Sequence, residues 1–99
     1  MYFEKLVFDI GNCPVGKDTL LRVKYKNKME KPLIIQDIRS GCGCTVVKWE
    51  REPLAPGESS QIEIHYNSKN QGVFIKQVVI RSNAPNSPIK LLLKGYGND

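Results

Sequence analysis

Two cysteines separated by a single glycine, Cys42 and Cys44, are the residues whose types and spacing most directly indicate chemistry. Thiolates favour soft ions such as Cu(I) and Zn(II), and a Cys-x-Cys pair can present both sulfurs to one ion. Structural zinc sites usually have about two to four residues between paired cysteines, so this spacing fits a two- or three-coordinate Cu(I) site better. Cys13 and His65, the only histidine, are the candidate additional ligands.

The same cysteines support two other interpretations. A disulfide from Cys13 to Cys42 or Cys44 would close a loop of about 30 residues and contribute a few kcal/mol, or the thiols are simply buried. A disulfide between Cys42 and Cys44 would be strained, because adjacent extended residues hold their Cα atoms near the outer limit for bridging. Strained disulfides exchange readily. A structural role, a Cu(I) site and a thiol-redox site therefore all remain open.

Seven short segments have the composition of β-strands and end in turn residues. In residues 61–67, Ile62, Ile64 and Tyr66 alternate with polar side chains, and residues 73–82 are rich in Val and Ile. The other predicted strands are residues 2–10, 19–27, 33–39, 45–49 and a last strand from Ile89 to near Gly95. We expect a loop over residues 11–18 and a loose tail over residues 96–99.

This pattern predicts an all-β protein. No segment has helical periodicity, and no repeat or linker divides the 99 residues, so we expect a single domain over residues 1–99. Seven strands in about a hundred residues are typical of an immunoglobulin-like β-sandwich of antiparallel strands. A small five- or six-stranded barrel is the alternative.

The order of antiparallel strands predicts where the chemistry would lie. Successive loops alternate between the two ends of a sandwich, so the loops after the first, third and fifth strands share one end. All three cysteines are then expected at one pole, and His65 lies close to the end of the fifth strand. This pole is the predicted contact surface, formed by Cys42, Gly43, Cys44, Thr45 and Trp49.

Composition narrows the function classes. The formal net charge is +5, which favours acidic surfaces without indicating nucleic acid. Arg22, Lys24 and Lys26 form a basic stripe on one predicted strand face, but Tyr25 points inward, so no stacking platform accompanies them and we favour a solvated face. One histidine and no Gly-x-Ser-x-Gly motif give little support to hydrolase chemistry. No apolar run approaches the roughly 18 residues of a membrane-spanning helix.

Several short motifs occur in a familiar order along nearly the whole chain: Lys26-Asn27, Pro32-Leu33-Ile34-Ile35, Gly41-Cys42-Gly43-Cys44-Thr45, Leu54-Ala55-Pro56-Gly57-Glu58-Ser59, Ser82-Asn83-Ala84 and Pro88-Ile89. In this order the chain resembles a bacterial family known as domain of unknown function 1573, related to Hydin-like (ASH) and major-sperm-protein-like domains. The resemblance implies an immunoglobulin-like sandwich and an exported protein or lipoprotein, periplasmic or at the cell surface. It implies no activity, although the Hydin-like relatives are binding or scaffolding modules. The cytochrome-oxidase copper chaperones, another immunoglobulin-like group, carry a Cu(I)-binding Cys-x-Cys pair.

Export needs one further assumption. The amino terminus reads Met-Tyr-Phe-Glu-Lys and has neither the basic start nor the apolar stretch of a secretory signal. The protein is therefore cytosolic, or the chain is a domain taken from a longer one.

Taken together, these features predict a non-enzymatic binding or structural module whose partner is another protein, met through a sheet edge or the cysteine pole. Such a module requires no cofactor. The alternative is a periplasmic Cu(I)-binding or thiol-redox protein that uses Cys42 and Cys44, assisted by Cys13 or His65.

Overall fold

The computed structural model describes residues 1–40, 45–69 and 71–98. Its strands are β1 (Val7–Pro14), β2 (Asp18–Lys26), β3 (Ile35–Ser40), β4 (Thr45–Lys48), β5 (Ser59–Asn67), β6 (Gly72–Ser82) and β7 (Ile89–Asn98). Across these described ranges, no helix is long and apolar enough to cross a membrane.

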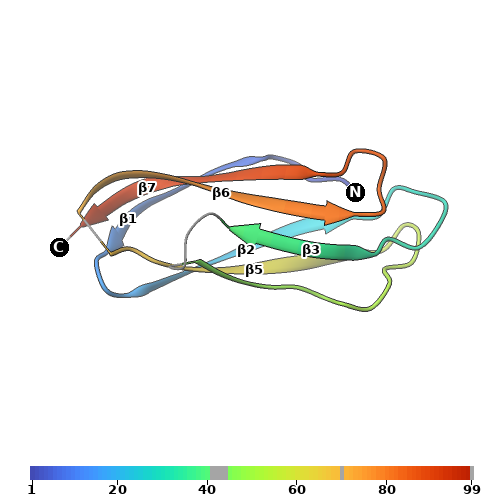
Figure 1. Cartoon of the computed structure of the whole chain (residues 1–99), viewed down its shortest axis with the longest axis horizontal. Helices are drawn as coiled ribbons and strands as arrows, with labels where there is room; N and C mark the ends of the chain where they lie inside the picture. Colours follow the sequence, from blue (N-terminus) through green and yellow to red (C-terminus); the bar gives the residue numbers. More distant parts are fainter. Residues whose placement is uncertain (41–44, 70, 99) are drawn as a thin grey trace.

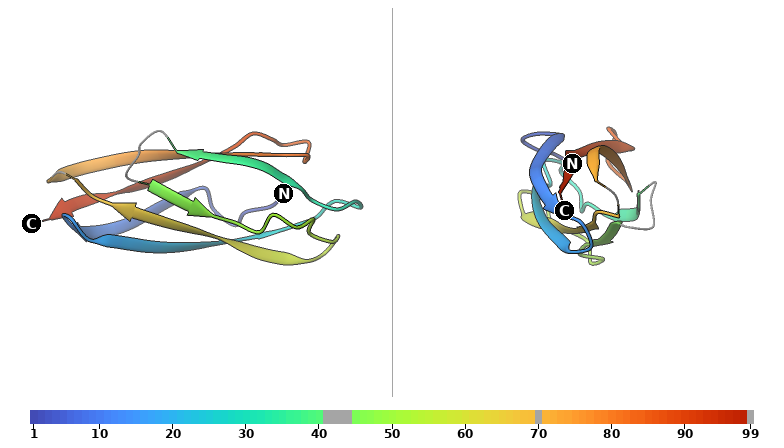
Figure 2. Two further views of the ribbon diagram at one scale, coloured as in Figure 1. Left: turned by 60° about the horizontal axis from the view of Figure 1, so that its bottom comes forward. Right: turned by 90° about the vertical axis from the view of Figure 1, so that its left-hand side faces the viewer.

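The strands form two facing sheets, as Figures 1 and 2 show. One sheet has four strands in the order β1-β7-β6-β3, and the other has three in the order β2-β5-β4. The molecule is long and narrow, with extents of 47 × 21 × 18 Å. This arrangement confirms the predicted immunoglobulin-like β-sandwich.

The core lies between the two sheets, where alternate residues of each strand point inward. Ile62, Ile64 and Tyr66 of β5 are buried, as their alternation predicts. From the other sheet they face the buried Val78 and Ile80 of β6 and the buried Leu91 and Leu93 of β7. The apolar alternation therefore sets the register of both inner faces.

The first strand lies further along the chain than predicted. Residues 11–14 belong to β1 and not to a loop. Gly11 has a φ of 68°, its N–H donates to Asp9 Oδ1 at 2.9 Å, and the pairing register shifts between Asp9 and Asn12. The turn residues thus produce a bulge within the strand, because one irregular glycine can kink a strand without ending it.

The pairing of β1 also differs from the expected antiparallel arrangement. β1 pairs with β7 in parallel, from Val7 opposite Leu92 to Pro14 opposite Asn98. This pairing extends β7 to Asn98, so the prediction of a loose tail is wrong for residues 96–98. The tail is ordered because β7 has a neighbour on each side, β1 and β6.

The amino-terminal segment connects the two sheets. Tyr2 and Lys26 form a hydrogen-bonded antiparallel pair, with N–O distances of 2.9 and 3.0 Å. Four residues later the chain has reached the other sheet, where Leu6 C=O accepts the Leu92 N–H at 2.8 Å. Residues 3–6 therefore cross the gap between the sheet edges, and this segment does not continue the pairing from Lys26 back along β2 towards Lys24.

A fully buried asparagine fastens the loops at the end of the sandwich near Lys26. The Asn27 side chain donates to the C=O groups of Lys31 and Leu54 at 2.9 and 2.8 Å, and its Oδ1 accepts the Met29 N–H at 2.8 Å. Its backbone C=O accepts the Gly57 N–H at 2.8 Å. One side chain thus satisfies backbone groups of two separate loops.

Two further features complete this fastened end. Glu58 N–H donates to Ala55 C=O at 3.1 Å, and Gly57 has a φ of 81°, as the third residue of a type II turn requires. On the opposite side, Asn83 Oδ1 accepts the Ile34 N–H at 2.9 Å, while its Nδ2 donates to Pro32 C=O at 3.0 Å. We use "fastened end" below for the loops held by Asn27 and Asn83.

Candidate functional site: a groove at the free edge of β2

The Cys-x-Cys pair lies outside the described residues. The Cu(I), redox and pole-contact hypotheses depend on Cys42, Gly43 and Cys44 and therefore stay predictions. Among the residues that are described, no group of three or more His, Cys, Asp or Glu side chains is placed to hold a metal ion.

The third cysteine, Cys13, is fully buried near the end of β1 and has a free thiol. Its Sγ lies 3.9 Å from Gly11 C=O, within reach of a weak S–H hydrogen bond. Gly16 N–H donates to Ser68 C=O at 2.9 Å, so the β1–β2 turn and the segment after β5 lie at the same end, as the strand order predicts. Cys13 is thus a buried free cysteine, while both partners of the predicted disulfide, Cys42 and Cys44, lie outside the described residues.

The remaining predicted site residues are only partly accessible. Half-buried His65 of β5 has its Nε2 3.5 Å from Glu63 Oε2, which is an ion pair only when the imidazole is protonated. Thr45 is buried at the start of β4. Trp49 is half-buried against the core, with the Arg51 guanidinium 4.3 Å from its ring centroid. Trp49 therefore lies at the rim of the core.

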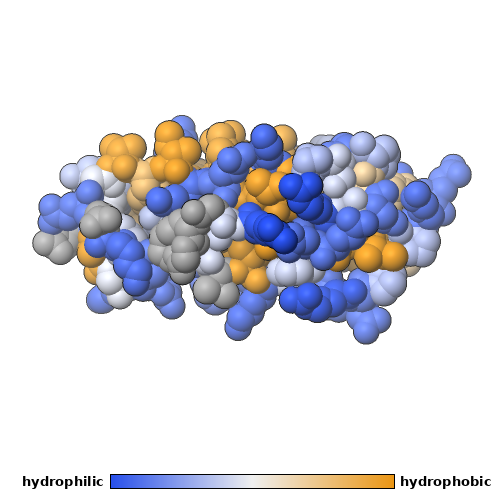
Figure 3. Space-filling view, viewed as in Figure 1, coloured by the Kyte–Doolittle hydropathy of each residue, from blue (hydrophilic) through white to orange (hydrophobic). Residues whose placement is uncertain are grey.

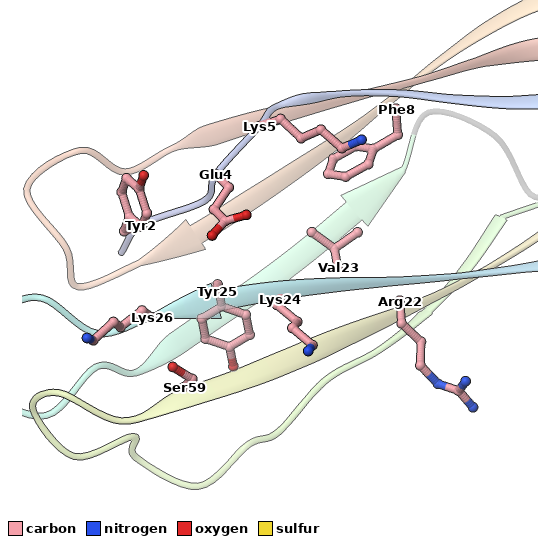
Figure 4. A pocket seen from close by; sticks show the side chains of 10 residues that line it. All are labelled: Tyr2, Glu4, Lys5, Phe8, Arg22, Val23, Lys24, Tyr25, Lys26 and Ser59. Atoms are coloured by element: carbon pink, nitrogen blue, oxygen red, sulfur yellow. The ribbon is translucent and has the colours of Figure 1, made fainter.

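A groove of about 470 Å³ opens where the amino-terminal segment leaves β2. In Figure 4, the amino-terminal segment lies along one side of this groove and β2 along the other. Its lining residues are Tyr2, Glu4, Lys5, Phe8, Arg22, Val23, Lys24, Tyr25, Lys26 and Ser59. Five consecutive residues of β2 contribute, so the groove follows about 13 Å of extended strand.

Along this groove, no backbone hydrogen bond within the described part of the chain holds the outward-facing groups of β2 beyond the Tyr2–Lys26 pair. β2 is an edge strand whose partner is β5 on its other side. Lys26 turns its N–H and C=O towards Tyr2, away from β5. In an antiparallel pair these directions alternate along the strand, so the N–H and C=O groups of Lys24 and Arg22 also point away from β5, into the groove.

Charge around the groove is mostly positive. Four basic side chains and one acidic side chain line it. Arg22 has an acid nearby, since its Nε lies 3.9 Å from Glu63 Oε1. By contrast, Lys24 and Lys26 lie opposite Gln61 and Ser59 of β5, which carry no charge. The outer side of the groove therefore presents cations that β5 does not neutralise.

The inner side of the groove is apolar and aromatic. Phe8, Val23 and Tyr25 are buried, and Lys5 Nζ lies 5.3 Å from the centroid of the Phe8 ring. Burial raises the pKa of the Tyr25 phenol above its usual value, and a hydrogen bond with Ser60 opposes part of that rise. Apolar and cationic surfaces therefore lie on opposite sides of one unpaired strand edge.

The sequence indicated the β2 side of this groove but not the side formed by the amino-terminal segment. Sequence reasoning identified the stripe of Arg22, Lys24 and Lys26 but favoured a solvated face, and it treated residues 2–10 as one strand. The crossing of residues 3–6 creates the groove and brings Lys5 to it. A signal was present, because the alternation of residues 2–10 is imperfect: Phe3 is apolar out of phase with Leu6 and Phe8.

A second exposed feature lies on the outer face of the four-stranded sheet. In Figure 3, hydrophobic side chains gather along the upper edge of the molecule, over this sheet. Val73 and Ile75 of β6 are 79% and 65% exposed. The charges beside them, Asp9 and Lys94, have opposite signs and lie opposite one another, so they select no partner.

Three solved structures with similar folds come from Porphyromonas gingivalis, human and Caenorhabditis elegans. A protein of unknown function from Porphyromonas gingivalis W83 superposes with a TM-score of 0.80 at 16% identity, covering 92% of this chain and 44% of its own. The ASH/PapD-like domain 7 of human CEP192 gives 0.81 at 7% identity, covering 99% and 84%. The MSP-domain-like SSP-19 of Caenorhabditis elegans gives 0.55 at 10% identity, covering 90% and 94%. This chain thus spans less than half the length of the Porphyromonas protein.

These likenesses confirm the predicted relation to ASH and major-sperm-protein-like folds. A search of curated proteins found no match. The family model described as protein of unknown function (DUF1573) matches residues 1–96. The chain therefore belongs to the DUF1573 family.

Proposed function

We propose that this chain is a non-enzymatic binding module of an exported bacterial protein, and that it binds another protein through the free edge of β2. The observation that carries the proposal is an open groove along which the outward-facing backbone groups of Arg22 and Lys24 have no partner among the described residues. Exposed sheet edges are a common means of protein recognition, because the edge supplies main-chain hydrogen bonds and the flanking pockets select side chains.

The chemistry of the groove supports binding in preference to catalysis. Its side chains are mainly exposed cations and buried aromatic rings, which hold a ligand by charge and packing. Export is proposed from the resemblance described above, in which family members are commonly exported or lipid-anchored. This chain covers 44% of the Porphyromonas protein. The proposed partner is therefore a partner of this domain, whatever longer protein contains it.

Selection from a displayed random-peptide library tests this function. The bait is the whole domain, and the matched bait is the Lys24→Pro variant. Proline at residue 24 removes an N–H that points into the groove and leaves the β2–β5 ladder complete. We expect selected peptides to bind the original domain at least about tenfold more tightly than Lys24→Pro, a difference of about 1.4 kcal/mol.

Circular dichroism and urea unfolding establish that Lys24→Pro is folded. If that variant is unfolded, Lys24→Glu, which keeps the backbone N–H, serves with NMR mapping of the bound peptide. Peptides that bind both baits equally, or that shift amide signals away from β2, would overturn the proposal.

A further inference from the structure

The groove along β2 also indicates what kind of segment it accepts. We infer that it binds an extended acidic segment of another protein, in which acidic residues alternate with apolar ones, added as a new strand beside Arg22 and Lys24. The inference rests on the proposed function and deepens it by naming the partner's chemistry.

Main-chain geometry is the first step. Tyr2 already forms the first antiparallel pair on this edge, opposite Lys26, before the chain departs to β7. An added segment would continue the same line, where the next backbone groups directed away from β5 belong to Lys24 and Arg22. The groove length of about 13 Å accommodates about four residues of such a strand.

Side-chain alternation is the second step. Successive side chains of an added strand point to opposite faces of the sheet. On the inner face they meet Phe8 and Val23, which favours apolar residues. On the outer face they lie beside exposed Arg22 and Lys24, and opposite charges across neighbouring strands are stabilising. The acceptable pattern is therefore acidic and apolar at alternate positions.

Charge around the mouth of the groove supports the same choice. Lys5 lies on the amino-terminal side, and Lys28 Nζ lies 3.7 Å from the centroid of the Tyr2 ring. The cations also make a second copy of this chain a poor occupant. Two β2 edges paired together would bring Arg22, Lys24 and Lys26 against their own copies, and like charges directly opposite are destabilising.

Synthetic peptides of about eight residues, long enough to form a strand, test the inference. The probe alternates Glu and Val, and two matched peptides carry Gln or Lys in place of Glu. By fluorescence anisotropy, we expect the Glu peptide to bind at least about tenfold more tightly than the Gln peptide. Raising the salt from about 0.05 M to about 0.5 M should weaken the Glu peptide more than the Gln peptide.

Reversal of charge in the protein should reverse the preference. In Lys24→Glu the Glu peptide should lose its advantage over the Lys peptide. Lys90→Glu makes the same charge change on an exposed residue of β7, in the other sheet, and should leave the preference unchanged. Methylation of alternate backbone nitrogens in the Glu peptide should abolish binding in one register and preserve it in the other, because only alternate N–H groups face β2.

The outcomes separate this inference from the proposed function. Equal affinity for Glu and Gln peptides at the β2 edge would overturn the acidic preference and leave binding at the edge intact. Binding that is insensitive to methylation in either register, or that heparin competes away in both Lys24→Glu and the original protein, would show simple polyanion attraction and overturn strand addition. Library peptides that bind β2 while all designed peptides fail would likewise overturn only this inference.

Discussion

The fastened end and the β2 groove meet at adjacent residues, Asn27 and Lys26, yet they differ in whether their backbone N–H and C=O groups are hydrogen-bonded. At the fastened end, Asn27 is fully buried and its side chain makes three hydrogen bonds to backbone groups, two within its own loop and one to Leu54 in another loop. Along the groove, alternate backbone groups of β2 face open space beside exposed cations. One region completes its hydrogen bonding within the chain, and the other leaves it available to a partner.

The same contrast appears in the motifs on which the family resemblance rests. The motif residues Asn27, Pro56, Gly57 and Asn83 all belong to the fastened end. Of the groove residues, Lys26 and Ser59 belong to these motifs, whereas Arg22, Lys24 and Lys5 belong to none of them. The described motifs therefore build mainly the scaffold, while Arg22 and Lys24, beside which a partner strand would lie, are outside them.

Removing the Asn27 side chain should have the largest effect on stability. Asn27→Ala leaves two C=O groups and one N–H without their partner, and each unsatisfied buried group costs about 1–3 kcal/mol. We expect the free energy of unfolding to fall by about 3 kcal/mol or more in urea titrations. Asn12→Ala, at an exposed asparagine of β1, is the control and should change it by less than about 0.5 kcal/mol. Equal effects at the two positions would remove the distinction between the fastened end and the rest of the surface.

Strain in the type II turn should have a smaller effect. Gly57 has a φ of 81° and no heavy atom within 4 Å of an added Cβ, so Gly57→Ala introduces backbone strain without a clash. We expect a loss of about 1 kcal/mol by urea unfolding. Gly57→Asn should lose less, because asparagine tolerates this conformation better than alanine does. A larger loss for the asparagine variant would mean that the turn acts through side-chain contacts.

Ionisation of Tyr25, which lines the groove, should make the free energy of unfolding depend on pH. Burial raises the pKa of Tyr25 above its unfolded value of about 10. The neutral phenol is therefore favoured by folding, so its contribution is complete below about pH 10 and is lost as the pH rises through the folded pKa. Unfolding free energies measured across this range should fall less steeply in Tyr25→Phe. Tyr66, whose pKa burial also raises, remains in both proteins and keeps part of the slope. Identical slopes would show that Tyr25 ionises as freely in the folded protein as in the unfolded chain.

Changing the groove cations should have the smallest effect on stability. Lys24 is exposed and lies opposite uncharged Gln61, so Lys24→Gln removes repulsion and no described ion pair. The free energy of unfolding should stay within about 0.5 kcal/mol of the original protein. A loss comparable to that of Asn27→Ala would place Lys24 in the scaffold, and the comparison of the two regions would fail.

Local alternation predicted the inner faces of the sandwich because each buried strand repeats its own pattern. Ile62 and Ile64 show this for β5, where burial follows the sequence residue by residue. The pairing of Val7 with Leu92 was not predictable in this way, since no local signal indicates a partner at the opposite end of the chain. Gly11 is typical of a strand end, but pairing with β7 continues the strand through it.

The same limit applies to the candidate site. The cations of β2 were visible in the sequence, but the groove exists because residues 3–6 change sheets, which depends on tertiary pairing. Cys42 and Cys44, the strongest chemical signal in the sequence, lie outside the described residues. Their predicted roles are therefore unchanged.

The parallel pairing of β1 with β7 has a consequence for the order of folding. Among the seven described strands, β1 is made before the others and its neighbour β7 is made after them, so the four-stranded layer cannot form until β7 has been made. Contacts between distant residues also slow folding, because a long loop must be ordered before they form. The residues of β1, Val7–Pro14, are therefore expected to form their sheet pairing only after β7 has been made. Folding of this domain is complete only when the chain has been made through residue 98.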